Sequence, residues 1–184
     1  ICHVLATTIA KRGSMQPKAP LLDASHPANE WKAYANASSL PAALNPPEGF
    51  LASANNRPTD TPFPIGYFFS ADERVRRLQQ ALGEREKISL DDLKRLQRDT
   101  VSLDSREVAA SLVALIEAEP DARAVAPQFL ADLKAFDGDY RVDARGPVVY
   151  ETLLYHLVPE VHGVCLPAAL AGPYAHFRQF YGGL

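Results

Sequence analysis

Apolar side chains recur at helical spacing from about residue 70 to the end of the chain. Positions three or four residues apart lie on one face of a helix, so each such stripe predicts an amphipathic helix. Six helices are predicted, the last on weaker spacing, with the stripes Val75-Leu78-Leu82, Leu90-Leu93-Leu96, Val108-Leu112-Leu115-Ile116, Val125-Phe129-Leu133 and Tyr150-Leu153-Leu154-Leu157, and a segment from Pro167 to Tyr181. Because apolar faces must be buried, we expect a helical cluster over residues 70–184.

Capping residues and helix breakers separate these stripes. A serine or aspartate before an apolar run, followed three residues later by glutamate, is typical of a helix start, and glycine or proline of a helix end. The predicted starts are Ser70 (as a capping box with Glu73), Ser89, Asp104 (with Glu107) and a point after Pro147, and the predicted ends are Gly83, Pro120, Asp137-Gly138 and Pro159.

The first third of the chain has a different composition. Nine of the 15 prolines precede residue 65, and proline removes a backbone donor and breaks helices. The β-branched run 3–10 predicts one strand, residues 11–28 a loop, and 50–54 a short strand that ends at Asn55-Asn56-Arg57-Pro58. The predicted fold class is therefore mainly α with a small β and loop-rich N-terminal region, divided into residues 1–69 and 70–184.

The net charge and the reactive residue types exclude some classes of function but do not identify one. A net charge of −3, from 19 basic and 22 acidic residues, argues against a nucleic-acid or anionic-membrane partner. No apolar run reaches the roughly 18 residues of a membrane span. The five histidines are scattered and Cys2 and Cys165 form no CxxC, so no metal ligand is predicted. Composition and pattern do not indicate a reaction.

One segment is more informative. Residues 45–58, Asn-Pro-Pro-Glu-Gly-Phe-Leu-Ala-Ser-Ala-Asn-Asn-Arg-Pro, resemble the NPxxGFxxxANNxP segment of the penicillin acylase family, which belongs to the N-terminal-nucleophile hydrolases. Further matches follow in the same order along the chain: the strand 1–12, Glu30-Trp31 with Leu40-Pro41, Ala71-Asp72-Glu73-Arg74-Val75, residues 90–99 and Phe136-Asp137-Gly138. The resemblance implies part of an αββα fold. It also implies that this chain is an internal fragment of the large (β) subunit, with the α subunit from the same precursor as a partner.

The resemblance also implies a reaction. In this family, autocatalytic cleavage exposes a serine or related nucleophile whose own α-amine is the general base, and an acyl-enzyme forms on it. Ile1 has no nucleophilic atom. The nucleophile is therefore expected upstream of residue 1 and further strands downstream of Leu184, and we expect no amidase activity from this chain alone. Family members are commonly exported, which implies a periplasmic or secreted protein.

Two residues match functional positions of the family. Asn55 matches the asparagine of the oxyanion hole, where a carboxamide donates a hydrogen bond without adding charge. Arg74 matches an arginine that lines the active site and positions the substrate. From the residues alone, Asn55 also fits an ordinary turn and Arg74 a surface arginine beside Arg76 and Arg77. Asn56 is interpreted as a structural turn residue.

The resemblance leaves several properties open. Many members bind a structural calcium between the Asn-Asn pair and the helix arginine, but residues 63–69 hold no carboxylate and Asp60 is the nearest candidate. We therefore predict no cofactor or metal ligand in this chain and leave structural calcium to the full-length protein. Candidate substrates are acyl amides of the β-lactam side-chain or N-acyl homoserine lactone type. The alternative function is a non-catalytic helical binding or scaffold module.

Overall fold

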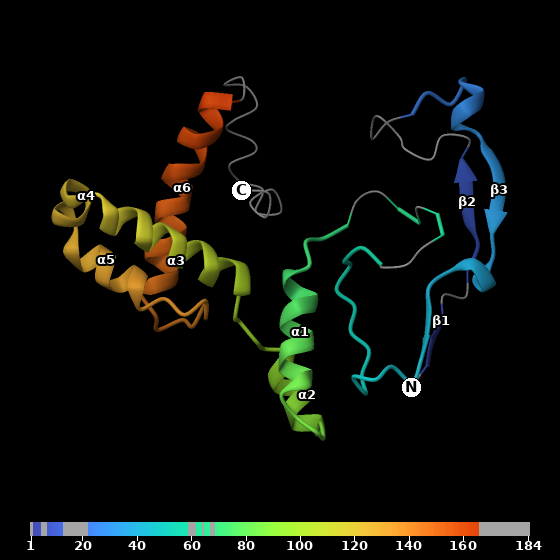
Figure 1. The fold of residues 1–184 in the computed structure, drawn as a ribbon, viewed down its shortest axis with the longest axis horizontal. Helices are drawn as coiled ribbons and strands as arrows, with labels where there is room; N and C mark the ends of the chain where they lie inside the picture. Colours follow the sequence, from blue (N-terminus) through green and yellow to red (C-terminus); the bar gives the residue numbers. More distant parts are fainter. Residues whose placement is uncertain are drawn as a thin grey trace. The chain divides into compact units, whose positions relative to one another are not determined.

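The computed structural model describes residues 2–4, 7–12, 22–58, 62–63, 65–66 and 69–165. Backbone contacts divide the chain into two units, residues 1–72 and 73–184, and each unit is described here by itself. Helices predominate and the strands are few and short, which confirms the predicted fold class of mainly α with a small β region (Figure 1). The predicted sixth helix, Pro167 to Tyr181, lies outside the described residues.

The first unit contains two small antiparallel sheets. β1 (Cys2–Val4) pairs with β4 (Ala42–Leu44), and β2 (Ile9–Arg12) pairs with β3 (Trp31–Ala35). Two short 3₁₀ helices, Pro27–Asn29 and Ala37–Ser39, flank β3. The buried side chains of Ala35, Leu40 and Phe63 form a small core beneath the second sheet.

Two strand predictions for this unit are wrong. The run 3–10 does not form one strand, because the chain leaves β1 and changes its partner from β4 to β3. A β-branched run indicates extended backbone but does not say which strand it pairs with. Residues 50–54 form no strand and are held as irregular backbone. The strands β3 and β4 were not predicted from the sequence.

The second unit is helical. Its helices are α1 (Glu73–Gly83), α2 (Leu90–Leu96), α3 (Leu103–Ala118), α4 (Pro120–Val125), α5 (Pro127–Lys134) and α6 (Gly146–Cys165). The middle helices α3 and α5 contact each other, and α5 also contacts α6 (Figure 1). None of the helices in the described part of the chain combines the length and apolar character that a membrane crossing requires.

The predicted stripes supply half of the buried residues of the helical core, namely Leu133, Tyr150 and Leu154. α3, α5 and α6, with the segment after α5, bury a common cluster: Ala109, Leu133, Phe136, Tyr150, Leu154 and Val158. Leu133 is the most enclosed of the large side chains, with 1% of its surface exposed. Three of the predicted stripe residues are exposed: Leu90, Leu93 and Leu115. Spacing identifies a face of a helix, but only tertiary contacts decide whether a partner covers it.

Several predicted helix ends are corrected by the structure. The capping box lies at Ser89 and Asp92, and α1 begins at Glu73, so Ser70 is not at its N-cap. The cap of α3 is Ser102, whose side chain accepts from the backbone N–H of Ser105, in place of Asp104. The predicted break at Pro120 is only partly correct, because the proline starts α4 directly after α3.

The end of α6 also differs from its prediction, since the helix runs past Pro159 to Cys165.

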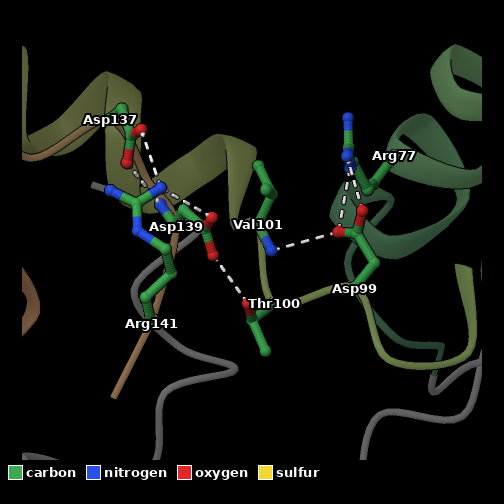
Figure 2. A network of polar contacts seen from close by, with 7 residues as sticks. All are labelled: Arg77, Asp99, Thr100, Val101, Asp137, Asp139 and Arg141. Atoms are coloured by element: carbon green, nitrogen blue, oxygen red, sulfur yellow. Dashed lines mark hydrogen bonds and ion pairs between the residues drawn. The ribbon is translucent and has the colours of Figure 1, made fainter. Parts of the chain in front are cut away.

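A polar network joins α1 to the segment before α3 and to the segment between α5 and α6 (Figure 2). Asp99 accepts two hydrogen bonds from Arg77, from Nε at 3.0 Å and from a terminal nitrogen at 2.5 Å, and one from the Val101 N–H at 3.0 Å. Thr100 Oγ1 donates to Asp139 at 2.6 Å. The network continues through two bonds from Arg141, to Asp137 and Asp139.

The Arg77–Asp99 pair is expected to make stability depend on acid. Arg77 lowers the pKa of Asp99 chiefly through its hydrogen bonds, partial burial opposes this shift, and the Val101 N–H adds to it. A carboxyl group with a lowered pKa stabilises the folded state above its unfolded pKa of about 3.9 and loses that contribution as the pH falls through the folded value. Asp99→Asn is therefore expected to cost about 1 kcal/mol at pH 7, a value reduced for solvent screening, and less at pH 3.

Urea unfolding at pH 7 and pH 3 measures this difference. Asp91→Asn is the matched control, because Asp91 is 76% exposed and its ion-pair partner, Lys94, lies in the same helix turn, unlike the partner of Asp99, which lies in α1. We expect this control to lie within a few tenths of a kcal/mol of the wild type at both pH values. A loss for Asp99→Asn that is equal at pH 7 and pH 3 would contradict the assignment.

Candidate active site

The Asn-Asn turn has an unusual backbone. Asn55 has φ 61°, in the left-handed region that costs most residues about 1–2 kcal/mol and that asparagine tolerates best. Its carbonyl accepts a hydrogen bond from the Ser70 N–H at 2.9 Å. The residue is exposed, whereas the preceding Ala54 is buried. The Asn55 carboxamide is therefore carried at the surface by a backbone that is fixed on both sides.

Its neighbour Asn56 supports the turn itself. The Asn56 Oδ1 accepts from the Ala54 N–H at 3.1 Å, and its Nδ2 donates to the Arg57 carbonyl at 3.3 Å. Asn56 also forms a parallel bridge with Ser70. The side chain of Asn56 therefore bonds to the backbone of its own turn.

The segment that leads into α1 completes this support. The centre of the Arg57 guanidinium lies 5.1 Å from the centroid of the Phe69 ring, and the Ser70 N–H bonds to Asn55. Neither of these two contacts was predicted from the sequence, since no local pattern connects residues 57 and 69. In the chain, only residues 71–73 separate Ser70 from Arg74.

Arg74 lies in the first turn of α1, as the sequence predicted. It is exposed, and the next residue, Val75, is buried. Its other neighbours in this turn contact the start of α3: Glu73 accepts from the Ser102 hydroxyl, and Arg76 donates to Asp104 and to Glu107. Asn55 belongs to the first unit and Arg74 to the second, so each is described within its own unit.

No metal ligand was predicted for this chain from its sequence. Within residues 2–4, 7–12, 22–58, 62–63, 65–66 and 69–165, no group of three or more His, Cys, Asp or Glu side chains is placed to hold a metal ion. Asp60, the nearest calcium candidate, lies outside these residues.

A hollow of about 240 Å³ between α1 and α2 has no hydroxyl or thiol nucleophile among its lining residues. Its wall contains Leu82, Ile88 and several charged side chains, and no serine, threonine, cysteine, lysine or histidine. Three of these charges are paired across it, since Arg85 and Arg95 both contact Asp92. The hydrogen bonds from Ser89 are the main cause that lowers the pKa of Asp92 to about 2. The hollow is therefore part of the α1–α2 packing.

Comparison with known proteins places the chain in a family. A family model described as Penicillin amidase matches residues 1–180. The chain therefore belongs to the penicillin amidase family, and through it to the N-terminal-nucleophile hydrolases. The family implies a hydrolase that acts on acyl amides. A comparison with individually curated proteins gives no significant match.

Proposed function

We propose that this chain supplies two parts of the active site of an acyl-amide hydrolase with an N-terminal nucleophile. Asn55 donates a hydrogen bond to the oxyanion of the tetrahedral intermediate, and Arg74 orients the substrate. The nucleophile itself lies outside the chain, so residues 1–184 alone do not hydrolyse amides. The observation that carries the proposal is the exposed carboxamide of Asn55, on a turn that other residues hold in place.

The chemistry of the proposed oxyanion hole requires a donor that is already in position. When a nucleophile adds to an amide carbonyl, the negative charge collects on the carbonyl oxygen, and a donor that need not reorganise stabilises it most. The backbone of Asn55 is held by Ser70, and the turn by Asn56 and by the Arg57–Phe69 contact. These contacts support a carboxamide of fixed direction, which a mobile turn would not provide.

The proposed role of Arg74 rests on its place in α1. A guanidinium presents several donors in a rigid plane, which suits the orientation of carboxylate and carbonyl groups. The first turn of a helix disfavours a cation by a few tenths of a kcal/mol, so an arginine there is not explained by helix stability. Arg74 is exposed. Glu73 and Arg76, in the same turn, bond to Ser102 and Asp104 at the start of α3.

The proposal also covers the substrates, the partner subunits and the location of the enzyme. The substrates are amides of the β-lactam side-chain or N-acyl homoserine lactone type, and the partners are the rest of the β subunit and the α subunit, produced by autocatalytic processing. We place the protein in the periplasm or outside the cell, and we assign any structural calcium to parts of the full-length protein beyond these residues.

Hydrolysis by the natural-length protein tests the proposal. The processed protein is expected to release the amine from a chromogenic acyl anilide and to form a covalent acyl-enzyme, detected by intact mass after rapid quenching. Residues 1–184 expressed alone, with the same substrate, form the control and are expected to release none. A processed protein with no activity toward acyl anilides, β-lactams and N-acyl homoserine lactones would instead favour a binding or scaffold module.

A further inference from the structure

The first turn of α1 is fastened to the first turn of α3 by two polar contacts. The Ser102 hydroxyl donates to the carboxylate of Glu73, and Arg76 donates to Asp104. A second bond from Arg76, to Glu107, measures 3.3 Å. Arg74 lies between Glu73 and Arg76 in the chain, so the turn that carries it is held on both sides of it in sequence.

Ser102 is itself fixed from the opposite direction. Its N–H donates to the Gly138 carbonyl at 2.8 Å, and its Oγ accepts from the Ser105 N–H at 3.1 Å. Gly138 approaches so closely that a Cβ placed on it would lie 2.5 Å from the Ser102 carbonyl oxygen. Behind this contact, the Ser105 hydroxyl lies 2.9 Å from the Tyr140 hydroxyl. Ser102 therefore has little freedom to move.

The protons of this cluster give Ser102 a defined task. A serine hydroxyl carries one proton, and an ionised carboxylate can only accept. The proton of Ser102 is therefore directed to Glu73, and the Ser102 oxygen accepts from the Ser105 backbone N–H. One side chain thus caps α3 and at the same time attaches the start of α1 to it.

We propose that Ser102 and Glu73 are positioning residues for Arg74. Neither contacts the substrate; the hydrogen bond between them sets the place of the α1 turn from which Arg74 reaches it. The proposal rests on the proposed function of Arg74 and deepens it. The proposal connects two of the segments that resemble the family, residues 71–75 and 136–138. The Gly138 carbonyl accepts from the Ser102 N–H, and the Ser102 hydroxyl donates to Glu73, which precedes Arg74 in the chain.

A double-mutant cycle in the processed natural-length protein tests the proposal. Glu73→Ala and Ser102→Ala are each expected to lower kcat/KM for an acyl anilide about 5- to 10-fold, mainly through a higher KM, since small misplacements of a positioning group weaken substrate alignment. The kcat/KM of the double variant is expected to be no lower than that of the less active single variant, because both changes remove the same bond. Ser102→Thr keeps a hydroxyl and is expected to restore kcat/KM to within about 2-fold of the wild type.

The controls separate positioning from stability. Glu117→Ala removes an ion pair to Lys134, at 2.5 Å, in the same helical unit, and is expected to leave kcat/KM unchanged. If the Glu73 and Ser102 variants keep wild-type kcat/KM, or if their losses multiply in the double variant, the positioning role is overturned. Arg74→Ala identifies the source of a failure: unchanged kcat/KM in this variant would also remove the proposed role of Arg74, whereas a loss of about 10-fold or more would leave that role intact.

Discussion

Replacing Asn55 with glycine is expected to lower kcat for acyl-amide hydrolysis by about 100- to 1000-fold with little change in KM. The oxyanion exists only in the transition state and the intermediates, so a donor aimed at it contributes to kcat and not to substrate binding. Glycine is the informative replacement, because it removes the carboxamide together with its Cβ and adopts the φ of 61° without strain. Steady-state kinetics of the processed natural-length protein give the measurement.

Asn45 provides a matched control for this experiment. It is an asparagine in the same unit, and its φ of 47° is also positive. Asn45→Gly makes the same chemical change at a position with no proposed role, and its kcat is expected to stay within about 2-fold of the wild type. Equal losses for both variants would mean that the turn conformation matters and the carboxamide of Asn55 does not. Asn55→Asp, which replaces the donor with an acceptor, should be as inactive as Asn55→Gly.

Replacing Gly138 with alanine is expected to destabilise the helical unit by about 2–4 kcal/mol. Its φ is +87°, and the added Cβ would lie 2.5 Å from the Ser102 carbonyl oxygen and 2.9 Å from the Arg106 Cβ. Both neighbours lie at the start of α3. One is a backbone oxygen and the other a Cβ, so neither can rotate away. The melting temperature, followed by circular dichroism at 222 nm, should fall by roughly 5–15 °C.

Gly49→Ala isolates the contribution of the backbone angle. Gly49 has φ +77°, and no atom lies within 4 Å of a Cβ placed there. This variant is expected to lower the free energy of unfolding of its own unit by only about 1 kcal/mol. The fluorescence of the single tryptophan, Trp31, which lies in the same unit, measures this change. If Gly138→Ala were no more destabilising than Gly49→Ala, the close approach to Ser102 would have no energetic weight.

The helical unit could be predicted from the sequence because the spacing of its apolar residues indicates which helix face is buried. Leu133, Tyr150 and Leu154 lie in predicted stripes and are buried in the core. The same rule failed for Leu115, which shares a stripe with residues that pack against the core but is 67% exposed. A period of 3.6 residues identifies the inner face and cannot identify where the partner helix ends.

The strands were harder to predict for a physical reason. β3 shows no alternation of buried and exposed residues, since only its last residue, Ala35, is buried. Without that period, extended backbone leaves no trace in the sequence except its β-branched and aromatic content. The partner strands are also fixed by pairings between residues more than 15 positions apart, which a local pattern does not contain.

The candidate site divides in the same way. The position of Asn55 follows from the segment 45–58, but its left-handed backbone and its bond to Ser70 are tertiary facts. Ser102 was missed altogether, although a serine before an apolar run is a recognised cap signal. The glutamate expected three residues later is absent there, and Ser105 occupies the place.

The nested pairing of the four strands has a consequence for how the first unit assembles. β2 pairs with β3 inside the longer stretch that β1 and β4 enclose. Loop-closure entropy favours the shorter inner loop. Once that hairpin has formed, only the connections 5–8 and 36–41 remain to be closed, so the outer pair becomes a local event. We therefore expect pairing in this region to spread outward from residues 12 and 31, with the β1–β4 pair forming last.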